Sequence, residues 1–160
     1  MLNAYFEVAI PPIVERYGGD VDRLIGDAVM VVFNRNGTQP DHALRAASAA
    51  LAIQMETSRL ADQHPGWPRF RVGVNSGEAT IAVLGAAGAR TQTAIGDTVN
   101  VAARLEGRAP VGGVAVGEDT ARRLPGGCTV LIGEVQVKGR EEPIEVHQLL
   151  HVLDDVAPSR

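Results

Sequence analysis

The sequence has one cysteine, no long apolar run and no cluster of basic residues. A single cysteine, Cys128, excludes a disulfide within the chain and a zinc site made of cysteines alone, and it fits a reducing compartment. We expect its thiol to be half-buried in a strand. The apolar stretches are strand-length and interrupted by charge or glycine, and no signal-peptide pattern follows Met1. These absences predict a cytoplasmic chain with no membrane contact.

The sequence also has fewer basic than acidic residues. The chain has 15 Lys and Arg against 19 Asp and Glu, which gives a formal net charge of −4. This balance excludes a general attraction to nucleic acids or anionic membranes, so any basic residue that binds an anion must act locally. With 160 residues, 45% of them hydrophobic, the chain suits one globular domain. We place this domain at residues 1–153 and a C-terminal tail at 154–160.

The first third of the chain predicts a helix followed by a hairpin. Residues 2–17 carry apolar side chains at helical spacing, and the Pro-Pro pair within them should kink or divide the helix. Residues 20–25 and 28–33 are short apolar runs joined by Gly26 and Asp27. This pattern predicts a tight β-hairpin that exposes Asp27 at its turn.

The rest of the chain predicts alternating helices and strands. Residues 41–63 form the clearest helix, residues 70–85 one or two strands, and residues 97–107 another helix. Further strands are expected at 113–117, 128–137 and 144–153, with a helical turn near 118–124. Such alternation indicates an α+β (α/β) sandwich with helices packed on a sheet.

Five blocks of sequence, taken in order, carry a family resemblance. They are YGGDVDRLIGDAVMVVFN (17–34), DHALRAASAALAIQ (41–54), RVGVNSGEATIAVLG (71–85), TAIGDTVNVAARLE (93–106) and VQVKGREEPIEVHQL (135–149). Together they resemble the catalytic (cyclase homology) domain of bacterial class III adenylate and guanylate cyclases. The resemblance implies a ferredoxin-like βαββαβ core with extra strands, and two domains paired head to tail as a homodimer with active sites between them. The implied reaction converts ATP to 3′,5′-cyclic AMP and pyrophosphate in intracellular signalling.

The resemblance also assigns the residues that act on the metal, the ribose and the α-phosphate. Asp27 matches one of two aspartates that hold two Mg²⁺ or Mn²⁺ ions through hard oxygen ligands; read alone, it is a plain turn residue. Asn100 matches the residue that orients the ribose, and Arg104 the residue that neutralises the α-phosphate in the transition state. Their spacing of four puts both on one helical face. The alternative is an exposed polar stripe on an amphipathic helix.

Four more positions are assigned to the other phosphates and to the base. Arg71 and Lys138 match residues that hold the β- and γ-phosphates, and the alternative is that both are ordinary solvated charges. Arg23 and Thr93 match the base-recognising pair, with Arg23 in place of a more usual Lys. Thr93 is typical of a bacterial subgroup similar to bicarbonate-responsive cyclases. Arg23 alone could be a surface charge.

The hydroxyl of Thr93 bears on the choice of base. It can accept a hydrogen bond from the adenine amino group, which favours ATP over GTP. Because a free hydroxyl can donate as well as accept, we expect discrimination within about tenfold. Guanylate cyclase activity is the alternative.

One part of the family pattern is missing from these 160 residues. The family has a strand similar to FADIVGFT before the first helix, and that strand supplies the second metal-binding Asp. We therefore describe the domain as N-terminally truncated, with an incomplete metal site. Because the family's first strand lies inside the sheet, its neighbours should be left without a partner strand unless another copy supplies one by strand exchange. A second interpretation follows, in which the domain is a catalytically silent module for nucleotide binding or dimerisation.

Overall fold

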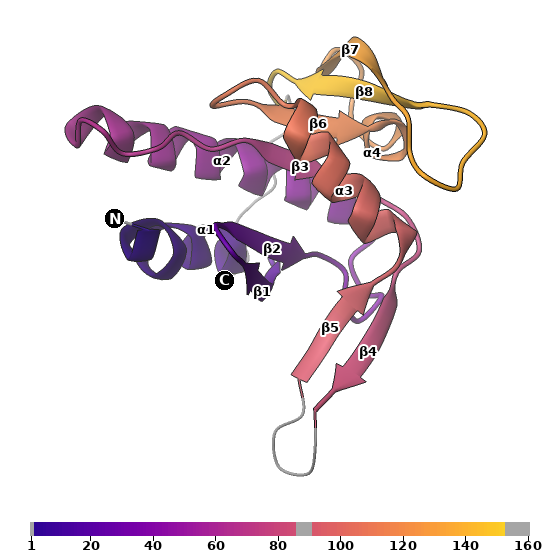
Figure 1. Ribbon diagram of the computed structural model, residues 1–160, viewed down its shortest axis with the longest axis horizontal. Coiled ribbons are helices and arrows are strands. Elements are labelled where there is room, and N and C mark those ends of the chain that lie inside the picture. The colour runs from indigo at the N-terminus through magenta and orange to yellow at the C-terminus, as the bar shows by residue number, and fades with distance from the viewer. Residues whose placement is uncertain (1, 86–90, 153–160) are drawn as a thin grey trace.

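The computed structural model describes residues 2–85 and 91–152, and it shows helices packed against β-sheets (Figure 1). The α+β fold class is as expected. The tail predicted at 154–160 lies outside the described residues. Within the described ranges, no helix combines the length and the apolar character needed to cross a membrane.

The N-terminal segment forms a divided helix and a hairpin. A π-helical segment, η1 (Ala4–Ala9), runs into α1 (Ile10–Arg16), which has its two prolines in its first turn, where a missing N–H is tolerated. The hairpin consists of β1 (Asp20–Ile25) and β2 (Ala28–Val32), and Ile25 pairs with Ala28 across the two-residue turn. Gly26 adopts a positive φ of 60° there, which is easy for glycine. Both predictions for this segment are confirmed.

The middle of the chain holds the two longer α-helices and three strands. They are α2 (His42–Gln63), β3 (Val72–Val74), β4 (Thr80–Leu84), β5 (Thr91–Ile95) and α3 (Asp97–Arg108). The range 70–85 therefore contains two strands, and the second Ile-Gly-Asp phrase lies at a strand-to-helix junction. In Figure 1, β4 and β5 form a hairpin that projects away from the rest of the molecule.

The C-terminal part comprises β6 (Val114–Gly117), α4 (Glu118–Arg122), β7 (Thr129–Val135) and β8 (Ile144–Leu149). Cys128 immediately precedes β7 and is completely buried in the hydrophobic core between α2 and the sheet. The expectation of a half-buried strand thiol was therefore wrong. A small thiol fills this part of the core as an apolar group would.

In the part of the chain that the structure describes, the strands form three separate sheets. β3, β6, β8 and β7 make one sheet in that order, while β1 with β2 and β4 with β5 are two-stranded. Within residues 2–85 and 91–152, β2 pairs only with β1, and β3 pairs only with β6. Both strands thus keep an edge without a strand partner, as expected for neighbours of the family's first strand.

The close approach of β3 to α3 depends on a glycine. A Cβ atom on Gly73 would overlap the backbone N of Glu106 and the backbone O of Ala102, both in α3. Only a residue without a side chain lets helix and strand pack at this distance. The packing matters for the site, because α3 carries Asn100 and Arg104.

We predict that Gly73→Ala lowers the free energy of unfolding by about 1–3 kcal/mol or more, because the added methyl group can only be accommodated by moving α3. Gly107→Ala is the matched control, since Gly107 lies in α3 and a Cβ there meets nothing within 4 Å. This control should raise stability by about 0.5–1 kcal/mol. Urea unfolding of both variants measures the difference, and equal effects would contradict the close packing.

Candidate active site

The two residues assigned to base recognition are in contact. Arg23 lies on β1 and Thr93 on β5, and Nη1 of Arg23 donates a hydrogen bond to Oγ1 of Thr93 at 3.0 Å. The two positions are 70 residues apart in the sequence. The fold therefore brings together a pair that the resemblance alone had put in one site.

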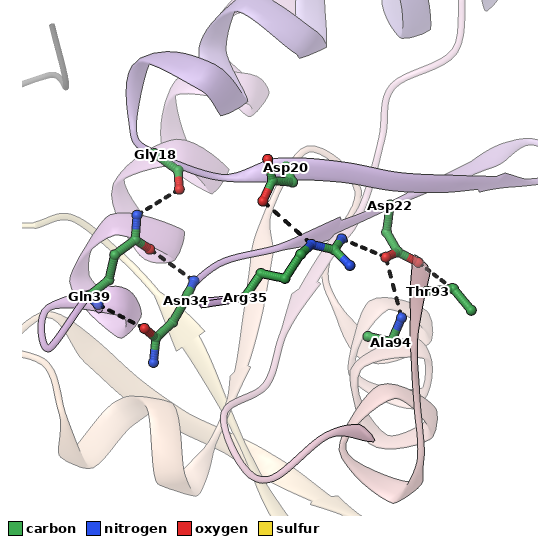
Figure 2. Close-up of polar contacts among 8 residues, drawn as sticks. All are labelled: Gly18, Asp20, Asp22, Asn34, Arg35, Gln39, Thr93 and Ala94. Atoms are coloured by element: carbon green, nitrogen blue, oxygen red, sulfur yellow. Dashed lines mark hydrogen bonds and ion pairs between the residues drawn. The ribbon is translucent and has the colours of Figure 1, made fainter. Parts of the chain in front are cut away.

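A third residue, Asp22, completes this group and was not predicted. Its Oδ2 accepts a hydrogen bond from Oγ1 of Thr93 at 2.6 Å, and its Oδ1 accepts one from the backbone N–H of Ala94 at 3.3 Å. Arg35 pairs with the same carboxylate at 2.6 Å, and it also lies 3.5 Å from Asp20 (Figure 2). The side chain of Asp22 is 0% exposed, whereas that of Asp20 is 61% exposed. Asp22 is therefore a buried carboxylate that depends on these partners.

A β-bulge explains how neighbouring residues reach the same oxygen. Val21 pairs with Val31 and Arg23 with Met30, so that Asp22 is the extra residue on β1. In a regular strand, consecutive side chains point to opposite faces. Because the bulge changes this alternation, both Asp22 and Arg23 contact Oγ1 of Thr93.

The loop after β2 holds Arg35 in place. Asn34 adopts a positive φ of 62°, a conformation that Asn tolerates better than most residues. Gln39 and Asn34 each accept the other's backbone N–H, at 2.9 and 2.8 Å, and Gln39 also donates to the carbonyl of Gly18 at 2.8 Å (Figure 2). This bracing fixes the start of the loop from which Arg35 reaches Asp22.

The environment of Asp22 sets its charge state. Burial raises the pKa of its carboxyl, but the hydrogen bonds from Thr93, Arg35 and the Ala94 N–H and the charge of Arg35 outweigh burial, so the pKa lies below its ordinary value of 3.8. Asp22 is therefore an anion at neutral pH and can only accept hydrogen bonds.

The five other predicted site residues are all exposed. Asp27 lies at the hairpin turn, Arg71 just before β3, and Lys138 in the loop after β7. Asn100 and Arg104 are exposed on α3 one turn apart, and this helix buries other residues, including Val101 and Leu105. In the described ranges, no hydrogen bond or ion pair joins any of these five side chains to another of them.

Across residues 2–85 and 91–152, no group of three or more His, Cys, Asp or Glu side chains is placed to hold an ion. Asp27 provides a hard oxygen ligand of the kind that Mg²⁺ binds, but one carboxylate does not make a metal site. The described residues therefore do not fit a metal centre built from this chain alone.

A cavity of about 600 Å³ lies elsewhere, between the end of β3 and the start of α3 and α4. Five acidic residues line it, with Arg140 as the cation among its lining residues. None of the seven predicted site residues contributes to it. Its acidic lining would repel a triphosphate, which disfavours this cavity as the nucleotide site.

Comparison with known proteins establishes the family. The profile of the adenylate and guanylate cyclase catalytic domain matches residues 12–151, and the chain belongs to this family. Adenylate cyclase 1 of Rhizobium meliloti is 30% identical over 167 residues, which cover 96% of this chain and 24% of that protein. Adenylate cyclase 2 of the same bacterium is 32% identical over 155 residues, 92% of this chain and 42% of that protein. The chain thus spans less than half the length of these relatives.

Solved structures of both types of cyclase have this fold. The guanylyl cyclase Cya2 matches with a TM-score of 0.85 and 26% identity, over 99% of this chain and 82% of that chain. The adenylyl cyclase CyaB from P. aeruginosa matches with a TM-score of 0.82 and 29% identity, over 97% and 83%. The α+β cyclase fold is thereby confirmed, and overall similarity does not distinguish the two bases.

Sequence reasoning missed Asp22 and Arg35. A signal existed, because aspartate is depleted in strands and Asp22 lies between Val21 and Arg23 inside a predicted strand. An acid in such a position needs a partner if it is buried. The partner itself could not be identified, since Arg35 reaches Asp22 only through the conformation of the loop.

We predict that Asp22→Asn lowers the free energy of unfolding by about 1–3 kcal/mol at pH 7, because Arg35 and Thr93 lose a charged acceptor. The folded pKa of Asp22 is depressed, so its stabilising effect is present above pH 3.8 and is lost as the pH falls below that value through the folded pKa. The difference in free energy of unfolding between wild type and Asp22→Asn should therefore become smaller in acid. Denaturant unfolding in steps from pH 7 to about pH 3 measures it, with the half-exposed Asp20→Asn as the control of smaller effect. A gap that is constant or grows in acid would contradict this assignment.

Proposed function

We propose that this domain converts ATP to 3′,5′-cyclic AMP and pyrophosphate at sites shared between two copies of the chain. The contact between Arg23 and Thr93 supports the proposal most directly, because two positions assigned to the base meet across β1 and β5. The family membership of residues 12–151 supports the class of reaction.

The exposed cations are assigned to different phosphates of the nucleotide. In the reaction, the ribose 3′-oxygen attacks the α-phosphorus and pyrophosphate leaves, so negative charge develops around the α-phosphate. We assign Arg104 to this charge and Asn100 to the ribose. Arg71 and Lys138 hold the β- and γ-phosphates, where charge-assisted hydrogen bonds are strong. All four side chains are exposed, and in the described part of the chain no hydrogen bond or ion pair joins one of them to another.

Divalent metal ions belong to the chemistry of this family, and they would neutralise phosphate charge when bound. Asp27 is the residue in this chain that we assign to them. Since Asp27 is not joined by a cluster of carboxylates in the described residues, the nucleotide phosphates or another chain segment must provide further ligands. We therefore expect nucleotide binding to be retained more fully than turnover.

Exposed apolar side chains on β1 and on the β4–β5 hairpin support pairing of two copies. Five large apolar side chains on β1 and on the projecting β4–β5 hairpin are 41–57% exposed: Leu24, Ile25, Val83, Leu84 and Ile95. Such a group of exposed apolar residues is typical of an interaction surface. In the proposed dimer, one copy contributes Asp27 and Arg71 to each site, and the other contributes Asn100, Arg104 and Lys138.

Two other functions remain as alternatives with specific support. Among the described residues no group of three or more side chains is placed to hold a metal ion, and this favours a silent domain that binds nucleotide or dimerises without turnover. Similarity to guanylyl cyclases such as Cya2 keeps GTP as a possible substrate. The contact between Arg23 and Thr93 favours ATP, because the hydroxyl of Thr93 can accept a hydrogen bond from the adenine amino group.

We predict that Arg104→Ala lowers cyclic AMP formation from Mn²⁺-ATP by about 100-fold or more, because a charge placed for the transition state is lost. Arg108→Ala is the matched control, one helical turn further on α3 and also exposed. The measurement is cyclic AMP formed, together with ATP affinity by calorimetry. ATP binding without any cyclic AMP would favour the silent domain, and no ATP binding would overturn the proposed function.

We predict that Leu84→Asp weakens self-association at least about tenfold, because a charge replaces an apolar side chain at the proposed interface. Leu131→Asp is the control, since Leu131 on β7 is 54% exposed and Leu84 is 53% exposed. Sedimentation velocity across a concentration series gives the dimer fraction. If the Leu131 variant dissociates and the Leu84 variant does not, the interface has been assigned to the wrong face.

A further inference from the structure

We propose that Asp22 is a specificity-determining residue, which holds the hydroxyl proton of Thr93 so that Thr93 presents only an acceptor to the purine base. The inference rests on the proposed function, since it assumes that a base is read by Arg23 and Thr93. It assigns a role to a residue that touches Thr93 and acts through it.

The direction of the hydrogen bonds at Thr93 follows from its two partners. A guanidinium has donors only, so Oγ1 of Thr93 must accept from Nη1 of Arg23. An ionised carboxylate has acceptors only, so the hydroxyl hydrogen must point to Oδ2 of Asp22, at 2.6 Å. The two partners therefore require the same orientation of the Thr93 hydroxyl. Its hydrogen points to Asp22, and its lone pairs point away from Asp22.

Asp22 itself is held firmly enough to keep this proton. Arg35 and the Ala94 N–H occupy its other oxygen, Oδ1, at 2.6 and 3.3 Å (Figure 2). Its side chain is fully buried, so water does not compete for the carboxylate. The oxygen that faces Thr93 is therefore left to that one hydroxyl.

The pattern matches adenine and opposes a 6-oxopurine. Adenine has a donor, the 6-amino group, beside an acceptor, N1, whereas guanine and hypoxanthine have an acceptor, O6, beside a donor, N1–H. An acceptor-only Thr93 beside a donor-only Arg23 complements the first pair at both atoms. With guanine or hypoxanthine, the lone pairs of Thr93 would face those of O6, and the N–H groups of Arg23 would face N1–H.

Arg23 occupies the position that the proposal gives to the base. Thr93 is only 3% exposed, and Arg23 Nη1 donates to the oxygen that the amino group of adenine would use. Nε of Arg23 is buried and has no hydrogen-bond partner in the described part of the chain. When a base enters, Arg23 turns from Thr93 to N1 of the purine, and the 6-amino group replaces it on Thr93.

This arrangement raises the expected selectivity. A freely rotating hydroxyl would adapt to either base and limit discrimination to about tenfold, as expected from the sequence. Because the proton is committed to Asp22, Thr93 cannot adapt, and we expect the wild type to bind ATP more than about tenfold tighter than ITP. ITP is chosen because it has the 6-oxo group without the 2-amino group of guanine.

The test is calorimetric titration of the whole chain with the Mg²⁺ complexes of 3′-deoxy-ATP and 3′-deoxy-ITP, which lack the attacking hydroxyl. In Asp22→Asn, the amide N–H₂ can donate to Thr93 and release its hydroxyl proton toward the base. We expect the ATP preference of this variant to fall at least about fivefold relative to wild type. Asp20→Asn is the matched control, because Asp20 also lies near Arg35 but does not touch Thr93, and its preference should stay that of wild type.

Thr93→Val keeps the test decisive should Asp22→Asn fail to fold. An acceptor-only hydroxyl helps ATP and repels ITP, so its removal should weaken ATP binding and leave ITP binding unchanged or tighter. A hydroxyl that donates to O6 predicts the opposite, a loss of ITP affinity.

Several outcomes separate this inference from the proposed function. A wild-type preference below tenfold, an Asp22→Asn preference equal to that of wild type, or an ITP loss in Thr93→Val overturns the role of Asp22 and leaves the cyclase assignment standing. Binding of neither nucleotide overturns both. A general loss of affinity in Asp22→Asn with the wild-type ratio intact would assign Asp22 a purely structural role and overturn the inference.

Discussion

The buried carboxylate of Asp22 joins three segments that are far apart in the sequence. It links β1 to β5 through Thr93 and the Ala94 N–H, and it links both strands to the loop after β2 through Arg35. Since β1 and β5 belong to different two-stranded sheets, no ladder of backbone hydrogen bonds connects them. A buried carboxylate is costly unless it keeps its hydrogen-bonding partners. This requirement fixes the position of the β1–β2 hairpin relative to the β4–β5 hairpin.

The base and phosphate ends of the proposed site are built differently. The base-reading group is buried and already hydrogen-bonded within one copy of the chain. Arg104 and Lys138, by contrast, are exposed. A triphosphate needs several cations at once, and exposed side chains lose conformational freedom when they bind it. In the proposed dimer, a second copy would bring further cations to the same phosphates and so complete this exposed end of the site.

The local sequence pattern predicted most helices and strands, but it could not predict which residues of distant segments contact each other. The period of residues 41–63 matched α2, and the Gly26-Asp27 turn matched the hairpin, because both depend on neighbours in sequence. The bulge at Asp22 could not be read from the sequence, since it depends on which residue of β2 faces which residue of β1. The burial of Cys128 was underestimated for the same reason, because the packing of α2 on the sheet decides it. Among the site residues, the resemblance named Arg23 and Thr93, and only the fold showed what they touch.

Arg35 determines what Arg23 is free to do. Asp20 and Asp22 carry two negative charges, and Arg23 and Arg35 carry two positive ones, so the group is electrically balanced without a ligand. If Arg35 were absent, the nearest cation for the buried carboxylate would be Arg23, and an ion pair in a region of low dielectric would hold that guanidinium away from the base. Because Arg35 pairs with Asp22 at 2.6 Å, Arg23 needs only a contact with the uncharged hydroxyl of Thr93. A hydrogen bond from a guanidinium to an uncharged acceptor can be exchanged for one to purine N1, which is also uncharged, at less cost than breaking a buried ion pair. In the proposed function, the ion pair between Asp22 and Arg35 thus leaves Arg23 free to turn to the base.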